Sequence, residues 1–213
     1  MKSDVTSLRK DYGRFELDHS KMDPDPIVFF EKWMEEAINA ELPDPTAMTL
    51  STVSADGFPS SRIVLLKGVE NGCFTFFTNY ESKKGTELIQ NLNGALTFFW
   101  PQLERQVNIT GQVEKTSNEQ SDEYFASRPR KSQLGAWASK QGEELSSRIE
   151  LMKDFGLVSL KYLGRKVPRP PFWGGFQLEP RTIEFWQGRP SRLHDRMLYS
   201  KSDDQWVIKR LSP

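Results

Sequence analysis

Residues 51–79 read STVSADGFPSSRIVLLKGVENGCFTFFTN, and this stretch decides the predicted fold class. Two turn dipeptides, Asp56-Gly57 and Asn71-Gly72, separate runs that are rich in β-branched and aromatic residues. Such dipeptides between apolar runs are the strongest local indication of a β-hairpin, because the tight turn needs positive φ angles. The pattern therefore predicts consecutive antiparallel strands at Met48–Ser54, Ser61–Lys67 and Cys73–Asn79.

The β-type pattern continues along the rest of the chain, with helical segments between the strands. Further strands are predicted at Ala95–Trp100, Arg105–Glu114, Phe172–Leu178, Thr182–Gln187, Arg192–Tyr199 and Gln205–Leu211. Helices are predicted at Ile27–Ala40, Ser82–Asn91, Ser117–Ala126, Ser132–Ala138 and Glu144–Leu163. Consecutive strands with tight turns favour a barrel or sandwich over a parallel α/β sheet. The expected class is α+β, mainly β, with a polar mobile arm at residues 1–24 and one domain at residues 25–213.

Composition excludes several classes of function. The 213 residues carry 29 basic and 29 acidic side chains, so the net charge argues against a nucleic-acid-binding protein. A single cysteine, Cys73, excludes an internal disulfide and favours a cytoplasmic location. No apolar run is long enough for a membrane span. With His19 and His194 the only histidines, no zinc site of His and Cys ligands is expected, and no metal is predicted.

Phosphate-binding glycine loops are absent from the sequence, so any phosphate must be held by side chains and scattered amides. Arg62 and Lys67 bracket an apolar strand, which is read either as a buried strand with solvated ends or as a strand whose ends meet an anion. Ser82 is a candidate helix cap that places Lys83 and Lys84 in the first helical turn. Cations are unfavourable at that end of a helix by roughly 0.3–1 kcal/mol each, unless a phosphate lies there.

The last signal is the segment around His194. In an extended strand Arg192, His194 and Arg196 would share one face, with Leu193 and Met197 turned toward the core. A row of Arg, His and Arg is unfavourable unless it meets water or an anionic ligand. A histidine is also the side chain best suited to exchange protons near neutral pH. The row is therefore read either as a solvated face or as a ligand-binding face.

Six strings, in this order along the chain, resemble the pyridoxine 5′-phosphate oxidase family. They are RIVLLK (62–67), FTNYESKK (77–84), LERQV (103–107), YFASRPRKSQLGAWASKQ (124–141), FWGGF (172–176) and EFWQGRPSRLHDR (184–196). The resemblance implies an FMN-binding split β-barrel that forms a homodimer with FMN at the subunit interface. It implies oxidation of pyridoxine 5′-phosphate or pyridoxamine 5′-phosphate to pyridoxal 5′-phosphate, with O2 reduced to H2O2.

The resemblance also assigns residues to roles. It implies FMN contacts at Arg62, Ile63, Val64, Leu65, Leu66, Lys67, Phe77, Thr78, Lys83, Lys84, Gln106, Gln141, Gly142, Trp186 and Arg196. It implies substrate contacts at Lys67, Tyr124, Arg128, Ser132, Arg192, Leu193 and His194, with Arg9, Lys10, Asp11 and Tyr12 in a segment that folds over the substrate. Arg192 and His194 are expected to orient the substrate and to assist its deprotonation. Two positions depart from the family: Lys83 replaces a common arginine, and Gly142 replaces a common serine.

Three alternatives remain open at this level. A split-barrel flavin oxidase of the phenazine-biosynthesis type would share the FMN residues and differ at the substrate pocket. A non-enzymatic FMN or pyridoxal-phosphate carrier would bind ligand without producing peroxide. A nucleic-acid or protein-interaction module is disfavoured by the zero net charge and by the absence of a binding motif.

Overall fold

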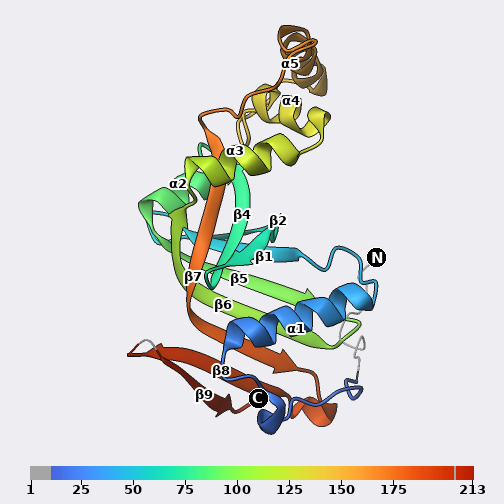
Figure 1. Cartoon of the computed structure of the whole chain (residues 1–213), viewed down its shortest axis with the longest axis vertical. Helices are drawn as coiled ribbons and strands as arrows, with labels where there is room; N and C mark the ends of the chain where they lie inside the picture. Colours follow the sequence, from blue (N-terminus) through green and yellow to red (C-terminus); the bar gives the residue numbers. More distant parts are fainter. Residues whose placement is uncertain (1–10, 204) are drawn as a thin grey trace, which may run out of the picture. The chain divides into compact units, whose positions relative to one another are not determined.

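The structure is a computed structural model that describes residues 11–203 and 205–213. Most of its elements are labelled in Figure 1. Their bounds are η1 (His19–Lys21), α1 (Pro26–Asn39), β1 (Ala47–Val53), β2 (Pro59–Leu65), β3 (Gly68–Glu70), β4 (Cys73–Asn79), α2 (Lys83–Gln90), β5 (Asn93–Trp100), β6 (Arg105–Lys115), α3 (Asn118–Ser127), α4 (Arg130–Ala138), α5 (Arg148–Lys161), β7 (Trp173–Gln187), η2 (Pro190–Arg192), β8 (Asp195–Ser202) and β9 (Gln205–Leu211). The predicted mainly β class is confirmed.

Within the described residues, nine strands form one sheet in the order β2-β1-β5-β6-β7-β4-β3, and β8 and β9 continue from β7. The chain divides into two compact units. Unit 1 comprises residues 11–49, Ala95–Thr110 and Pro180–Pro213, and unit 2 comprises Leu50–Gly94 and Gly111–Glu179.

Both predicted hairpin turns are present. Asn71 and Gly72 have φ angles of 51° and 76°, and the antiparallel pair Glu70↔Cys73 closes β3 against β4. Gly57 has a φ of 83° and its amide donates to the carbonyl of Ser54. These left-handed conformations explain why asparagine and glycine occupy the turns.

Helix α1 supplies much of the core of unit 1. Asp25 caps its N-terminus by accepting the amide N–H of Ile27, as expected before a proline at the first helical position. Its buried face carries aromatic rings: Phe30 lies 5.1 Å from Phe98 on β5, and Trp33 lies 5.1 Å from Phe185 on β7. Figure 1 shows α1 lying along these strands.

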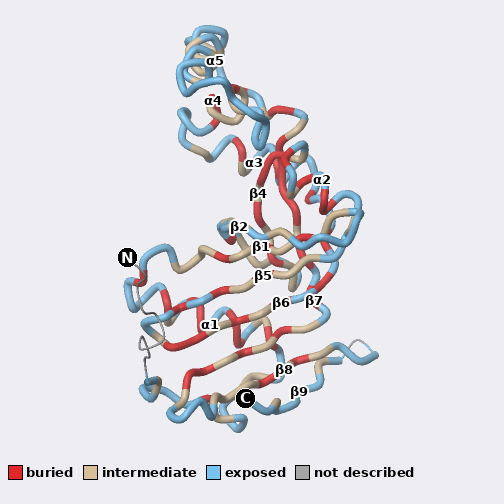
Figure 2. The backbone as a smooth tube through the Cα atoms, turned by 180° about the vertical axis from the view of Figure 1, so that it is seen from behind, coloured by how far each residue is buried: buried red, intermediate tan, exposed pale blue. Residues whose placement is uncertain are grey.

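The core of unit 2 centres on β4 and the first half of β7. Figure 2 shows this part of both strands as largely buried, whereas α5 is mostly exposed. Glycines of the FWGGF string allow close approach here, since a Cβ at Gly174 would lie 2.1 Å from the Tyr80 hydroxyl oxygen. The Tyr80 hydroxyl donates to the Gly175 carbonyl at 3.1 Å. A side chain at Gly174 would collide with the Tyr80 ring, and one at Gly175 would collide with Thr116 and Phe77.

The prediction of separate strands at Phe172–Leu178 and Thr182–Gln187 is wrong, because β7 runs unbroken from Trp173 to Gln187. Proline normally interrupts a sheet because it lacks the backbone N–H. The pairing with β4 ends at Leu178, and the pairing with β8 begins at Thr182. Pro180 therefore falls between these two partners and removes no hydrogen bond from either.

Candidate functional site

A cavity of about 270 Å³ in unit 2 brings together most of the residues predicted there. Its wall consists of Ile63, Val64, Leu65, Lys67, Phe77, Thr78, Asn79, Lys84, Tyr124, Arg128, Gln141 and Trp173. Ten of these twelve were predicted as FMN or substrate contacts. Sequence reasoning assigned no role to Asn79 and Trp173, although both belong to strings that carry the family resemblance.

Stacked aromatic rings form one wall of this cavity. The rings of Phe77 and Tyr124 are 4.0 Å apart and nearly parallel, and Trp173 lies 5.6 Å from Phe77. The guanidinium of Arg128 lies 4.6 Å from the centre of the Trp173 ring. The rings hold the arginine in place and shield it from water.

Arg128 carries a buried nitrogen without a partner. Among the described residues, its Nη1 is one of two buried side-chain atoms that have no hydrogen-bond partner. Burial lowers the pKa of Arg128 from its ordinary value, and the electrostatic interaction with Tyr124 acts in the opposite direction. A buried donor of this kind normally has an acceptor, and an anionic group in the cavity could supply one.

A larger cleft of about 680 Å³ lies elsewhere in unit 2, between α3 and the segment that follows α5. It contains none of the predicted residues. Its Arg169 is already engaged, donating to Asp122 at 2.6 Å and to the Trp173 carbonyl at 2.7 Å. The smaller cavity is therefore the better candidate, because only its wall includes a buried donor without a partner.

Strand β2 and the start of α2 border the cavity. One of the two sequence interpretations of β2 is contradicted, whereas the cap predicted for α2 is present. Reading β2 as a buried strand is wrong, because Ile63 and Leu65 are 65% and 41% exposed and β2 lies at an edge of the sheet. The Ser82 cap is confirmed, since the Ser82 hydroxyl accepts the Gly85 amide N–H at 3.4 Å. Burial, followed by the charge of Arg62, lowers the pKa of Lys84.

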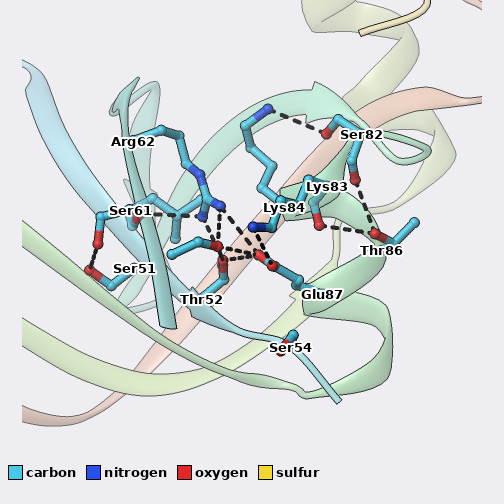
Figure 3. Close-up of polar contacts among 12 residues, drawn as sticks. Ser51, Thr52, Ser54, Ser61, Arg62, Ser82, Lys83, Lys84, Thr86 and Glu87 are labelled. Carbon is cyan, nitrogen blue, oxygen red and sulfur yellow. Dashed lines mark hydrogen bonds and ion pairs between the residues drawn. The ribbon is translucent and has the colours of Figure 1, made fainter. Parts of the chain in front are cut away.

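Five other predicted residues of unit 2 do not line the cavity: Arg62, Leu66, Lys83, Ser132 and Gly142. Arg62 instead joins a buried polar cluster with Glu87, which sequence reasoning missed (Figure 3). The pairing of Lys83 with Glu87 four residues later was the one local signal for that cluster. Gly142 has a φ of 98°, a conformation that explains why glycine suits this position better than serine.

The remaining predicted residues lie in unit 1, where Tyr12, Trp186 and His194 form an aromatic group. Trp186 lies 4.6 Å from His194 and 5.7 Å from Tyr12, measured between ring centres. Nδ1 of His194 accepts the backbone N–H of Arg189 at 3.1 Å, so the neutral ring carries its proton on Nε2. Burial, followed by the charge of Arg192, lowers the pKa of His194.

The predicted strand face of Arg192, His194 and Arg196 is wrong, because β8 begins only at Asp195. Pro190 opens the turn η2, in which Arg192 has a φ of 62°. Strand alternation therefore does not apply before Asp195. Leu193, which was predicted to face the core, is 69% exposed, whereas Met197 is fully buried as predicted.

Arg196 and Gln106 lie on strands of unit 1. Arg196 pairs with Glu184 through two hydrogen bonds of 2.7 and 3.2 Å, and this contact raises its pKa. Gln106 is half-buried on β6, and Asp11 is exposed. Arg9 and Lys10 lie outside the described residues.

Comparison with known proteins identifies the family. Residues 34–161 match the family described as Pyridoxamine 5′-phosphate oxidase. Residues 173–213 match a second family, described as the Pyridoxine 5′-phosphate oxidase C-terminal dimerisation region. The chain belongs to the pyridoxamine 5′-phosphate oxidase family. A relative named Pyridoxine/pyridoxamine 5′-phosphate oxidase from Burkholderia thailandensis is 53% identical over 98% of this chain and 99% of its own. Another of that name, from Paraburkholderia phymatum, is 55% identical over 99% of this chain and 100% of its own.

Solved structures of related proteins share the fold. PhzG from Burkholderia lata, solved with tetrahydrophenazine-1-carboxylic acid, has a TM-score of 0.89 and 27% identity over 96% of this chain and 100% of its own. A pyridoxamine 5′-phosphate oxidase-related, FMN-binding protein from Nostoc punctiforme has a TM-score of 0.70 and 15% identity over 90% of this chain and 100% of its own. These likenesses confirm the split β-barrel fold of the oxidase family. None of the described helices combines the length and apolar character that crossing a membrane requires.

Proposed function

We propose that this chain oxidises pyridoxine 5′-phosphate and pyridoxamine 5′-phosphate to pyridoxal 5′-phosphate, with FMN as cofactor and O2 as electron acceptor. The observation that carries the proposal is the buried, unpaired Nη1 of Arg128 in a cavity that Lys67 and Lys84 also line. A phosphate near two negative charges would supply the missing acceptor. The names of relatives that are more than 50% identical support the same substrates.

The site residues also fit a flavin phosphate. Arg62, Lys83 and Lys84 place three cations at one end of unit 2, and the helix α2, whose N-terminus favours an anion, begins there. Bound FMN would accept two electrons from the substrate and pass them to O2, which yields H2O2. The alcohol substrate would lose one hydrogen from C4′ and one from its 4′ hydroxyl to give the aldehyde. The amine substrate would lose one hydrogen from C4′ and one from its 4′ nitrogen, and the resulting imine would take up water and release ammonia.

The role of this chain is to bind the substrate, orient it and keep it out of water. We assign the substrate phosphate to Lys67, Tyr124, Arg128 and Ser132. Arg192 and His194 are assigned to the pyridine ring, with Tyr12 as part of a segment that folds over the substrate. Because Nδ1 of His194 already accepts the Arg189 amide, the neutral ring offers an N–H at Nε2. This arrangement favours orientation by hydrogen-bond donation over proton abstraction by His194.

A homodimer with FMN at the subunit interface is part of the same proposal. The exposed side chains of Ile63 and Leu65 on the edge strand β2, together with Phe58 at 73% exposure, suit a surface that a second copy covers. The match of residues 173–213 to a dimerisation region supports this assembly.

One experiment tests the function. The purified protein is expected to show a flavin absorption spectrum. With pyridoxine 5′-phosphate in air it should form H2O2 and the aldehyde product, which is followed by its absorbance, in equal molar amounts. Flavin without turnover would instead support the carrier alternative. Turnover of tetrahydrophenazine-1-carboxylic acid in place of both B6 phosphates would support the phenazine-type alternative, which the likeness to PhzG keeps in view. Either result would overturn the proposal.

A further inference from the structure

Glu87 on α2 is a buried carboxylate that the proposed reaction does not use. Its side chain is only 5% exposed, and an ionised carboxylate is rarely so buried unless it is paired. It lies at the end of unit 2 where Arg62, Lys83 and Lys84 gather (Figure 3). A negative charge here is at first sight unfavourable for binding a phosphate.

One oxygen of Glu87 collects three hydrogen bonds. Its Oε2 accepts from the Thr52 hydroxyl at 2.5 Å, from the Ser60 hydroxyl at 2.7 Å and from Nη2 of Arg62 at 3.2 Å. The other oxygen, Oε1, lies 3.8 Å from Nζ of Lys83. Burial by itself raises the pKa of Glu87, but these hydrogen bonds and the charge of Arg62 outweigh it, so the carboxyl stays ionised.

The same network holds the Arg62 guanidinium from several directions. Nη1 donates to the Thr52 hydroxyl at 2.5 Å and to the Leu50 carbonyl at 3.4 Å. Nη2 donates to the Ser60 hydroxyl at 2.8 Å as well as to Glu87. All four Nη hydrogens are thus engaged, which leaves the Nε hydrogen and the positive charge of Arg62 for a ligand.

The Glu87 carboxylate also balances positive charge at this end of unit 2. Arg62 and Lys84 are close enough for the charge of Arg62 to lower the pKa of Lys84. Within the described chain, the ion pairs of Arg62 and Lys83 are both made to Glu87. Without that carboxylate, Arg62 and Lys83 would lose these ion pairs, and the charges of Arg62, Lys83 and Lys84 would be left unbalanced at this end of unit 2.

We propose that Glu87 is a positioning residue. Its carboxylate on α2 holds the side chains of Arg62 on β2 and Lys83 on α2 in place, and so preorganises the binding site for the phosphate of FMN. The inference rests on the proposed function, because it takes the phosphate to be that of the flavin. It makes a specific prediction: Glu87 contributes to the binding of FMN and not to the binding of riboflavin, which has the same ring system without the phosphate.

Equilibrium titration with FMN and with riboflavin, followed by flavin fluorescence, measures this selectivity directly. In Glu87→Gln the amide offers one acceptor oxygen, so its NH2 must face either Lys83 or the Arg62 group. We expect FMN affinity to fall at least tenfold, which corresponds to about 1.4 kcal/mol, while riboflavin affinity stays within twofold. An unchanged or increased ratio of FMN to riboflavin affinity would overturn the proposal.

Glu81→Gln is the matched control. Glu81 is exposed, precedes the same helix and loses the same charge, but no ion pair joins its side chain to a described residue. Removal of a negative charge alone attracts a phosphate, so this variant should bind FMN equally or more tightly. A similar loss of FMN affinity in both variants would contradict the clamp.

A double-mutant cycle tests whether Glu87 acts through Arg62. In an Arg62→Ala background, Glu87→Gln should change the affinity ratio by less than twofold, because the group it positions is gone. A full tenfold effect in that background would refute positioning. Should Glu87→Gln fail to fold, Ser60→Ala keeps the carboxylate and removes its hydrogen bond, and it should lower the ratio by about threefold.

The outcomes separate this inference from the function it rests on. A parent protein that binds FMN no more tightly than riboflavin would refute the proposed cofactor. A parent that prefers FMN, with Glu87 variants that keep the preference, would refute only the role of Glu87.

Discussion

The substitution Arg128→Met should weaken binding of the substrate and leave the stability of the fold almost unchanged. The substitution keeps a long side chain over Trp173 and removes the charge and the unpaired Nη1. A charge-assisted hydrogen bond to a phosphate is worth about 1.5–3 kcal/mol, so KM for pyridoxine 5′-phosphate should rise about 10- to 150-fold. In the free protein, loss of the cation–π contact is offset by removal of a buried donor that has no acceptor. The free energy of unfolding should therefore change by less than about 1 kcal/mol.

Steady-state kinetics and urea denaturation measure these two quantities. Arg130→Met is the matched control, because Arg130 is a neighbouring arginine whose hydrogen bonds go to the carbonyls of Arg165 and Tyr162 outside the cavity. Its KM should stay within twofold of the parent value. Equal KM values for the parent and Arg128→Met, or an equal rise in both variants, would refute the assignment of Arg128 to the substrate phosphate.

Three further predictions follow from the same contacts. Gly85→Ala should destabilise the fold by more than about 2 kcal/mol in urea denaturation, because its Cβ would lie 2.3 Å from the Tyr80 carbonyl oxygen; a change under about 0.5 kcal/mol would contradict the packing. His194, one of only two histidines, should titrate below pH 6.5 by NMR and shift upward in Arg192→Gln; a midpoint at or above 6.5 in the parent would refute the burial. Glu87 has a lowered pKa, so its contribution to stability should be present above its unfolded value near 4.5 and disappear as the pH falls through the lower folded value; equal acid sensitivity of Glu87→Gln and the parent would contradict this.

Local sequence determined most of the secondary structure, because the signals involved act over a few residues. The turn at Asn71-Gly72, the strand Cys73–Asn79 and the cap at Ser82 depend on backbone conformations that the residues themselves prefer. Ser117 likewise caps α3, in a capping box with Gln120 in which both hydrogen bonds are present. The six strings that resemble the oxidase family, and their order, could likewise be recognised from the sequence alone.

Predictions failed where distant partners decide the outcome. Separate strands were predicted at Phe172–Leu178 and Thr182–Gln187, yet β7 continues through Pro180 because its partner changes there from β4 to β8. The segment before Asp195 was predicted as strand, but left-handed backbone at Ser191 and Arg192 turns the chain and leaves Leu193 exposed. Serine and arginine rarely adopt such a conformation, so the sequence did not predict it.

The sequence by itself determined the family, the mainly β class and which cations were available to hold phosphates. Only the tertiary structure decided how those cations are held. Glu87 meets Thr52, Ser60 and Arg62 across separations of 25 to 35 residues, and Arg128 reaches Trp173 from another segment. A buried charge is stabilised by whichever partners the fold brings within hydrogen-bond distance, and no local pattern records them.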